Sequence, residues 1–320
     1  MNLKPFPGYE LHVKAAGIDF GANATQEEKD WLAQKQGEWL IKYELPEGMT
    51  MEDMYIDGPD AGQKLRLRVY RPANLPENSP VVVEVHGGGW VGGSLEIDNR
   101  RCIFLAQHTP CVVIGVDYRV ASKEVAFPKP MEDVLCAWEY VTEHAAELKV
   151  DPKRMAFHGT SAGANLIAGA SLYIRDHGLN APVLTILNCP VLSDRDLGSA
   201  VQLGFGPGVD GASYTGKVDH IYYPHLDGST PSYYAFPLYC QDLQRLNPHY
   251  IVCGEYDSLR DHGVQYAVRL LHDGVPCDLV VAGRVDHGFC VVNEPFSDYV
   301  QTGCVTALQR EFGMLKGVNN

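Results

Sequence analysis

The chain has 320 residues, 45% of them hydrophobic, and a formal net charge of −14 at pH 7. This length suits one α/β domain with a small cap, and the acidic balance argues against nucleic acid as a partner, because nucleic-acid binding needs a basic surface. The nine cysteines form no C-x-x-C pair, which argues against a zinc site, and their odd number fits a reducing compartment better than a disulfide framework.

The N-terminal segment, residues 1–50, is predicted to be a cap segment separate from the body of the protein. Thr25 and Glu28 are spaced as in a capping box, and apolar residues at helical spacing follow them. A helix there would either pack on the surface of the main domain or cover a site within it. Met1 to Lys14 lacks the basic start and apolar core of a signal peptide, and no run of 18 apolar residues could span a membrane, so we expect a cytoplasmic protein.

Residues 51–320 are predicted to form one α/β domain, because strand-like and helix-like runs alternate along them. Short runs rich in β-branched residues mark the strands, at 65–70, 81–85, 112–116, 155–158, 183–187, 250–254 and 277–282. Helical stretches lie between them, at 100–108, 131–148, 162–175 and 261–273. Strands covered by helices on both faces have such apolar sequences. The alternation predicts a mostly parallel, doubly wound sheet, with 65–70 as an antiparallel edge strand.

A glycine-rich turn follows the predicted strand at 81–85, with the sequence His86-Gly87-Gly88-Gly89-Trp90. Glycines let a loop bring its backbone N–H groups close to a bound oxygen. Such groups stabilise the negative charge that acyl transfer builds on a carbonyl oxygen. A phosphate cradle is the alternative, but no Gly-Lys-Ser/Thr follows and the spacing is not that of a dinucleotide fingerprint. We therefore interpret this turn as an oxyanion hole.

The pentapeptide Gly159-Thr160-Ser161-Ala162-Gly163 lies between a short apolar run and a helical run of small residues. A serine on a tight strand-to-helix turn has an exposed hydroxyl, and the flanking glycines permit the sharp bend. Serine as the N-cap of an ordinary helix is the structural alternative. The strand before the motif and the helix after it favour Ser161 as a nucleophile.

An insertion at about 194–242 breaks the alternation of strands and helices. It contains Gly204-Phe205-Gly206-Pro207-Gly208, followed by Tyr214, Tyr222, Tyr223, Tyr233 and Tyr234. Glycine and proline indicate irregular structure. The tyrosines would either line a pocket for the substrate or only pack the insertion against the body.

A carboxylate and a histidine follow the last two predicted strands. Asp257 comes after 250–254 and His287 after 277–282, so Ser161, Asp257 and His287 stand in the chain order of α/β-hydrolase triads. Histidine can take a proton from serine, and a carboxylate can hold the histidine tautomer. Asp261 is the nearest rival to Asp257, but it is expected to cap the next helix. Asp286 adjoins His287 too closely in sequence to reach its ring.

These motifs resemble those of the hormone-sensitive-lipase-like family of α/β-hydrolase esterases, in its Gly-Thr-Ser-Ala-Gly branch. The likeness runs from about residue 65 to the C-terminus and also includes Asp117-Tyr118-Arg119, Phe127-Pro128, Gly254 to Asp261 and His287-Gly288-Phe289. The resemblance implies an α/β-hydrolase fold with a cap at 1–50 and 194–242. It also implies Ser161 as nucleophile, Asp257 as acid and His287 as base, with the N–H groups of Gly88, Gly89 and Ala162 as the oxyanion hole.

The function we predict is hydrolysis of short- to medium-chain carboxylic esters through an acyl-enzyme on Ser161, with neither metal nor organic cofactor. An amidase, a formamidase or a lactone hydrolase would use the same triad, and a non-catalytic ligand receptor on the same scaffold is an alternative of another class. The expected partner is a small-molecule ester, and family members are often homodimers. The family often has Pro-Glu at Ala121-Ser122 and proline at Ser258, so the resemblance does not give the substrate preference.

Overall fold

The computed structural model describes residues 43–203, 221–224, 230–289 and 294–315 of the chain. The helix predicted after Thr25 and the glycine-rich part of the insertion lie outside these ranges. The division into a cap segment at 1–50 and a domain at 51–320 therefore stays a prediction.

One sheet organises the described residues, with its strands in the order β1-β2-β4-β3-β5-β6-β7-β8. The bounds are β1 Thr50–Asp57, β2 Lys64–Arg71, β3 Ser79–Val85, β4 Val112–Val116, β5 Val150–Thr160, β6 Leu184–Asn188, β7 His249–Gly254 and β8 Cys277–Ala282. Strand β2 pairs antiparallel with both β1 and β4, and every other pair in the sheet is parallel. The predicted mostly parallel sheet of the α/β-hydrolase fold is thus confirmed.

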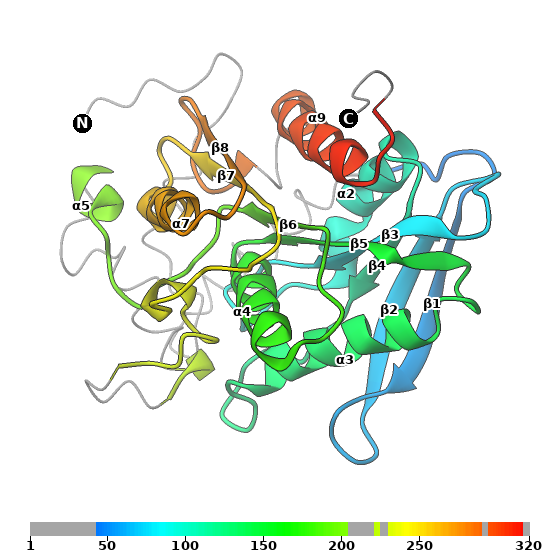
Figure 1. The fold of residues 1–320 in the computed structure, drawn as a ribbon, viewed down its shortest axis with the longest axis horizontal. Coiled ribbons are helices and arrows are strands. Elements are labelled where there is room, and N and C mark those ends of the chain that lie inside the picture. The colour runs from blue at the N-terminus through cyan, green and yellow to red at the C-terminus, as the bar shows by residue number, and fades with distance from the viewer. Residues whose placement is uncertain (1–42, 204–220, 225–229, 290–293, 316–320) are drawn as a thin grey trace, which may run out of the picture.

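Helices cover both faces of this sheet (Figure 1). The described helices are α2 Leu95–His108, α3 Lys129–Glu143, α4 Ala162–His177, α5 Ser199–Leu203, α7 Arg260–His272 and α9 Glu294–Glu311, with a 3-10 helix η2 at Pro237–Tyr239. One core contains the buried residues of α3, α4 and α7, and a second core contains those of α2 and α9. None of these helices combines the length and the hydrophobicity needed to cross a membrane.

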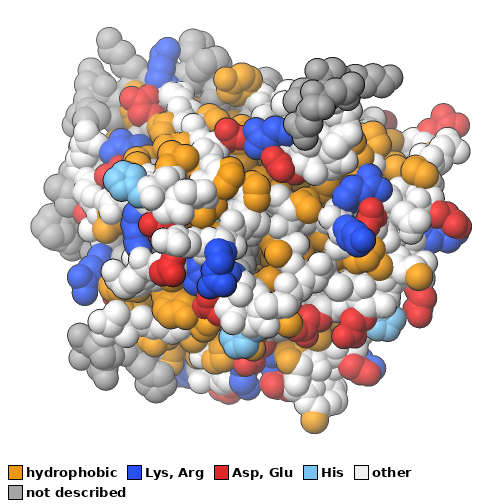
Figure 2. All heavy atoms as spheres, viewed as in Figure 1, with side chains coloured by type: hydrophobic (Ala, Val, Ile, Leu, Met, Phe, Trp, Pro, Cys, Tyr) orange, Lys and Arg blue, Asp and Glu red, His pale blue; other side chains and the backbone are white. Residues whose placement is uncertain are grey.

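The central strands supply side chains to both cores, because successive residues of a strand point to opposite faces. In β4, Val112 and Ile114 belong to the core under α3 and α4, whereas Val113 belongs to the core under α2 and α9. Such strands are apolar throughout, which is why their positions could be predicted. The surface, in contrast to these buried strands, has many charged side chains: on the face seen in Figure 2, Lys and Arg are interspersed with Asp and Glu.

The edge of the sheet differs from our prediction. Strand β2 was expected at the edge, but β1 pairs along its full length and takes that place. Most β1 side chains are exposed or half-buried, so the strand has little apolar signal in the sequence. The backbone ladder with β2 holds it in place, and an ion pair adds to this, in which Arg68 Nε and Nη2 donate to the Asp53 carboxylate at 2.6 and 2.9 Å.

The loop after β6 is held by a buried histidine of α7. His262 accepts the Leu192 N–H at Nδ1 (3.0 Å) and donates from Nε2 to the Arg195 carbonyl (3.0 Å). A ring that accepts at one nitrogen and donates at the other is neutral. Burial lowers the pKa of His262 to about 4, so the folded chain resists the protonation that the unfolded chain undergoes near pH 6.5.

Acid should therefore destabilise the fold through His262. The neutral ring contributes its full share to the free energy of unfolding above about pH 6.5, and this contribution is lost as the pH falls towards 4. We expect the free energy of unfolding to fall by about 2 kcal/mol between pH 7 and pH 5 from this group. Urea unfolding of the wild type and of His262→Gln at both pH values measures it. The variant should be less stable at pH 7 but lose less on acidification, and equal losses in both proteins would contradict the assignment.

Candidate active site

Ser161 lies on the turn between β5 and α4. Its backbone has φ 55° and ψ −117°, in the left-handed region of φ that non-glycine residues rarely adopt. The Ser161 N–H donates to the Asn188 carbonyl at 2.8 Å, which fixes the turn against β6. The hydroxyl makes no capping hydrogen bond with α4. Ser161 thus occupies the N-cap position of α4 without capping the helix through its side chain, and the turn has the geometry of a nucleophile elbow.

The glycines around Ser161 are needed for close packing. A methyl group at Gly163 would lie 2.0 Å from the Val85 carbonyl oxygen and 2.4 Å from that of His86. A methyl group at Gly159 would lie 2.8 Å from the backbone of Gly163. Small residues at these positions let the start of α4 pack directly on the end of β3, which brings Ser161 next to the glycine-rich turn.

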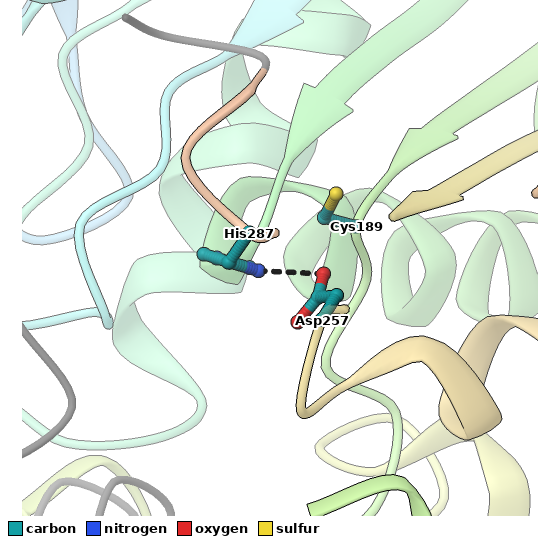
Figure 3. Close-up of side chains that lie close together, drawn as sticks. All are labelled: Cys189, Asp257 and His287. Atoms are coloured by element: carbon teal, nitrogen blue, oxygen red, sulfur yellow. Dashed lines mark hydrogen bonds and ion pairs between the residues drawn. The ribbon is translucent and has the colours of Figure 1, made fainter. Parts of the chain in front are cut away.

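The structure brings the three residues predicted as a triad into one hydrogen-bonded chain. His287 Nε2 lies 3.0 Å from Ser161 Oγ, and His287 Nδ1 lies 2.8 Å from Asp257 Oδ2. Figure 3 shows Asp257 and His287 facing each other from separate loops. Asp257 is fully buried, and its Oδ1 accepts the Leu259 N–H at 2.8 Å. With Nδ1 donating to the carboxylate, Nε2 is left to accept the serine proton.

The neighbouring carboxylates have local partners. Asp261 pairs with Arg260 at 2.8 Å in the first turn of α7, and Leu259 occupies the N-cap position there, so the prediction that Asp261 caps this helix was wrong. Asp286 accepts the Gly288 N–H at 3.1 Å. Asp257 is the carboxylate that bonds to the His287 ring.

The glycine-rich turn lies beside Ser161. A methyl group at Gly87 would lie 3.4 Å from Ser161 Cβ. Gly88 has φ 130°, and a methyl group there would lie 2.2 Å from the Gly92 carbonyl oxygen, so the turn requires glycine. Among the described residues, no backbone carbonyl accepts the N–H of Gly88 or Gly89. The predicted oxyanion hole needs donors that no backbone group occupies.

Trp90 anchors the end of this turn. Its ring stacks on Tyr222 with centroids 4.5 Å apart and planes inclined by 5°, and its Nε1 donates to Asn165 Oδ1 at 3.1 Å. Tyr222 comes from the insertion and is fully buried. It packs the insertion on the body, whereas Tyr233 and Tyr234 bond to Asp176 on α4. For these described tyrosines the packing interpretation holds.

A buried charged cluster lies behind the nucleophile turn, and the sequence did not reveal it. Arg101 Nη1 donates to Thr160 Oγ1 at 2.6 Å and lies 2.9 Å from Asp98 Oδ1 and 3.5 Å from Glu84 Oε1. Burial and the nearby Asp98 raise the pKa of Glu84, which favours its neutral form. Burial lowers the pKa of His158 beside it. The one sign of this cluster in the sequence is Glu84, a glutamate inside the apolar run from Val81 to Val85.

The parallel sheet, the strained serine turn and the histidine at the end of β8 together define an α/β hydrolase. A family model described as alpha/beta hydrolase fold matches residues 82–291. The chain belongs to this family, in its hormone-sensitive-lipase-like group, as the motifs predicted.

Relatives with curated names share most of the chain. An arylesterase of Saccharolobus solfataricus is 32% identical over 283 residues, which cover 83% of this chain and 85% of the relative. Esterase LipI of Mycobacterium tuberculosis is 33% identical over 244 residues, or 75% of each chain. Among solved structures, a bacterial heroin esterase aligns with a TM-score of 0.82 at 30% identity over 89% of this chain and 91% of its own. Esterase LipW of Mycobacterium marinum aligns with a TM-score of 0.83 at 30% identity over 97% and 98%.

Proposed function

We propose that this chain is a serine carboxylesterase that hydrolyses small carboxylic esters with short- to medium-chain acyl groups. The relatives named arylesterase, esterase and carboxylesterase support ester hydrolysis as the reaction. The observation that carries the catalytic assignment is the chain of hydrogen bonds from Ser161 through His287 to Asp257, at 3.0 and 2.8 Å.

In the proposed mechanism, Ser161 Oγ attacks the ester carbonyl carbon while His287 Nε2 takes the hydroxyl proton. Asp257 accepts the hydrogen bond that His287 donates from Nδ1–H. It thereby holds the tautomer of the ring and stabilises the imidazolium that forms. The negative oxygen of the tetrahedral intermediate is bound by the N–H groups of Gly88, Gly89 and Ala162, and Ala162 adds the positive end of the α4 dipole. His287 then protonates the leaving alcohol.

Deacylation repeats these steps with water as the nucleophile. His287 takes a proton from the water, which attacks the acyl carbonyl, and returns that proton to Ser161 as the carboxylic acid leaves. All groups needed for this cycle are protein side chains and backbone amides, so the proposal includes no cofactor.

The contact that supports a cap over the site is the stacking of Tyr222, from the insertion, on Trp90 at the end of the glycine-rich turn, with ring centroids 4.5 Å apart. Because Tyr222 belongs to the insertion at 194–242, we propose that this insertion, together with residues 1–50, caps the site.

A paired substrate series tests this function. Purified protein is given p-nitrophenyl esters from acetate to palmitate, and an aryl formamide in parallel. We expect kcat/KM to be highest between acetate and octanoate, to fall for palmitate, and to be higher for the best ester than for the formamide. A higher kcat/KM for the formamide would instead identify an amidase, and binding without turnover of any substrate would favour a receptor.

A further inference from the structure

A cysteine that the proposed reaction does not use lies beside the His287–Asp257 pair. Cys189 directly follows β6, is fully buried and has φ 47°. Its N–H donates to the Val252 carbonyl of β7 at 2.7 Å, which fixes the backbone at the edge of the sheet where the loops after β7 and β8 begin. Figure 3 shows Cys189, Asp257 and His287 side by side, each from a different loop.

The potential ligand atoms of these three residues all lie within 4.8 Å of one another. In a tetrahedral zinc site, bond lengths of about 2.0–2.3 Å put neighbouring ligand atoms about 3.5 Å apart. His287 Nδ1 and Asp257 Oδ2 lie 2.8 Å apart, so binding of a cation needs side-chain rotations that separate this pair and bring the three ligand atoms around the ion. The Asp257 oxygen that holds the Leu259 N–H is Oδ1, so Oδ2 is the oxygen that faces the site.

The donor set has a clear preference among cations. A thiolate and an imidazole bind borderline-soft metals such as Zn²⁺ and Cd²⁺, whereas Mg²⁺ and Ca²⁺ prefer oxygen ligands. One thiolate and one carboxylate balance the charge of a divalent cation. On binding, the Cys189 thiol would release its proton to solvent, and a water molecule would complete the tetrahedron.

We propose that Cys189, Asp257 and His287 form an inhibitory site for a thiophilic divalent cation. The inhibitory consequence rests on the proposed function: a cation held by Asp257 and His287 replaces the hydrogen bond between them, and Ser161 loses its oriented base. The cation enters past His287, whose side chain is 32% exposed, whereas Cys189 and Asp257 are closed to solvent. Metal binding and hydrolysis are therefore mutually exclusive at this site.

Titration of the purified full-length protein with CdCl₂ tests this proposal through two readouts. One is turnover of p-nitrophenyl butyrate, and the other is the ultraviolet charge-transfer absorption of a cadmium-bound thiolate, which does not depend on activity. Cys189→Ala removes the thiolate, and Cys189→Ser provides a second variant should the alanine protein fail to fold. Cys277→Ala is the matched control, because Cys277 is a half-buried thiol at the start of β8, the strand that ends before His287.

We expect Cd²⁺ to inhibit the wild type and Cys277→Ala at the same concentration, with recovery on addition of EDTA. Both Cys189 variants should hydrolyse the ester as the wild type does without metal. They should need at least about 10-fold more Cd²⁺ for half inhibition, because loss of a ligand costs at least as much affinity as loss of an outer-shell partner. The charge-transfer absorption at saturating Cd²⁺ should be smaller in them by the amount that one thiolate contributes. Equal inhibition of the wild type and the Cys189 variants, or equal absorption in all of them, would overturn the proposal. If the wild type hydrolyses no ester, the absorption difference still decides whether the site binds metal, so failure of the two proposals can be told apart.

Discussion

Ser161→Ala is expected to lower kcat for p-nitrophenyl butyrate by about 10⁵-fold or more, because the attacking oxygen is removed while the oxyanion hole and the binding site stay. The Ser161 hydroxyl makes no capping bond in α4, so its loss should leave the thermal unfolding midpoint within a few degrees of the wild-type value. Steady-state kinetics and thermal unfolding measure the two effects on one preparation.

Ser171→Ala is the matched control for this substitution. Ser171 is a buried serine of the same helix, and its hydroxyl bonds to the Ile167 carbonyl at 2.8 Å and to Thr185 at 3.0 Å. Its removal should cost about 1 kcal/mol of stability and leave kcat within a few-fold of the wild type. A Ser161→Ala protein that keeps most of its activity would show that another group is the nucleophile.

Gly163→Ala is expected to reduce the free energy of unfolding by about 3 kcal/mol or more. The added methyl group would lie 2.0 Å from the Val85 carbonyl oxygen, and a backbone atom cannot rotate away as a side chain can. Strand β3 and helix α4 must therefore separate, which also moves Ser161 away from the glycine-rich turn and lowers kcat. Urea unfolding measures the loss of stability.

Gly283→Ala provides the comparison for this effect. The nearest atom to a methyl group at Gly283 is Glu255 Oε2, at 3.7 Å, an ordinary contact distance. The free energy of unfolding of this variant should lie within about 1 kcal/mol of the wild-type value. If Gly163→Ala were equally stable, the close packing of α4 on β3 would not be as described.

Much of the fold could be predicted because buried parallel strands have apolar sequences. The runs at Val81 to Val85 and Val112 to Val116 coincide with β3 and β4, apart from two added residues at the start of β3. Strand β1 could not be predicted, since its side chains are largely exposed and its place depends on backbone pairing with β2. Local patterns carry the information for buried elements, and long-range pairing decides the edge.

In the candidate site, too, some features follow from local motifs and others depend on contacts between distant segments. The residues next to Ser161 and the turn at Gly88 follow from motifs whose glycines meet a local steric need. The contact between Arg101 and Thr160 joins residues 59 positions apart, and the approach of Cys189 to His287 depends on the order of β6, β7 and β8 in the sheet. No single segment of the sequence contains either juxtaposition, so both needed the structure.

Covalent labelling with an organophosphate is the most direct test of the account. Intact-mass measurement and peptide mapping of the labelled wild type should give one adduct per chain, on Ser161, with loss of ester turnover in proportion to labelling. A fully active protein that takes up no label, or a label on another residue that abolishes turnover while Ser161 stays unmodified, would contradict the proposal that Ser161, His287 and Asp257 act together in hydrolysis.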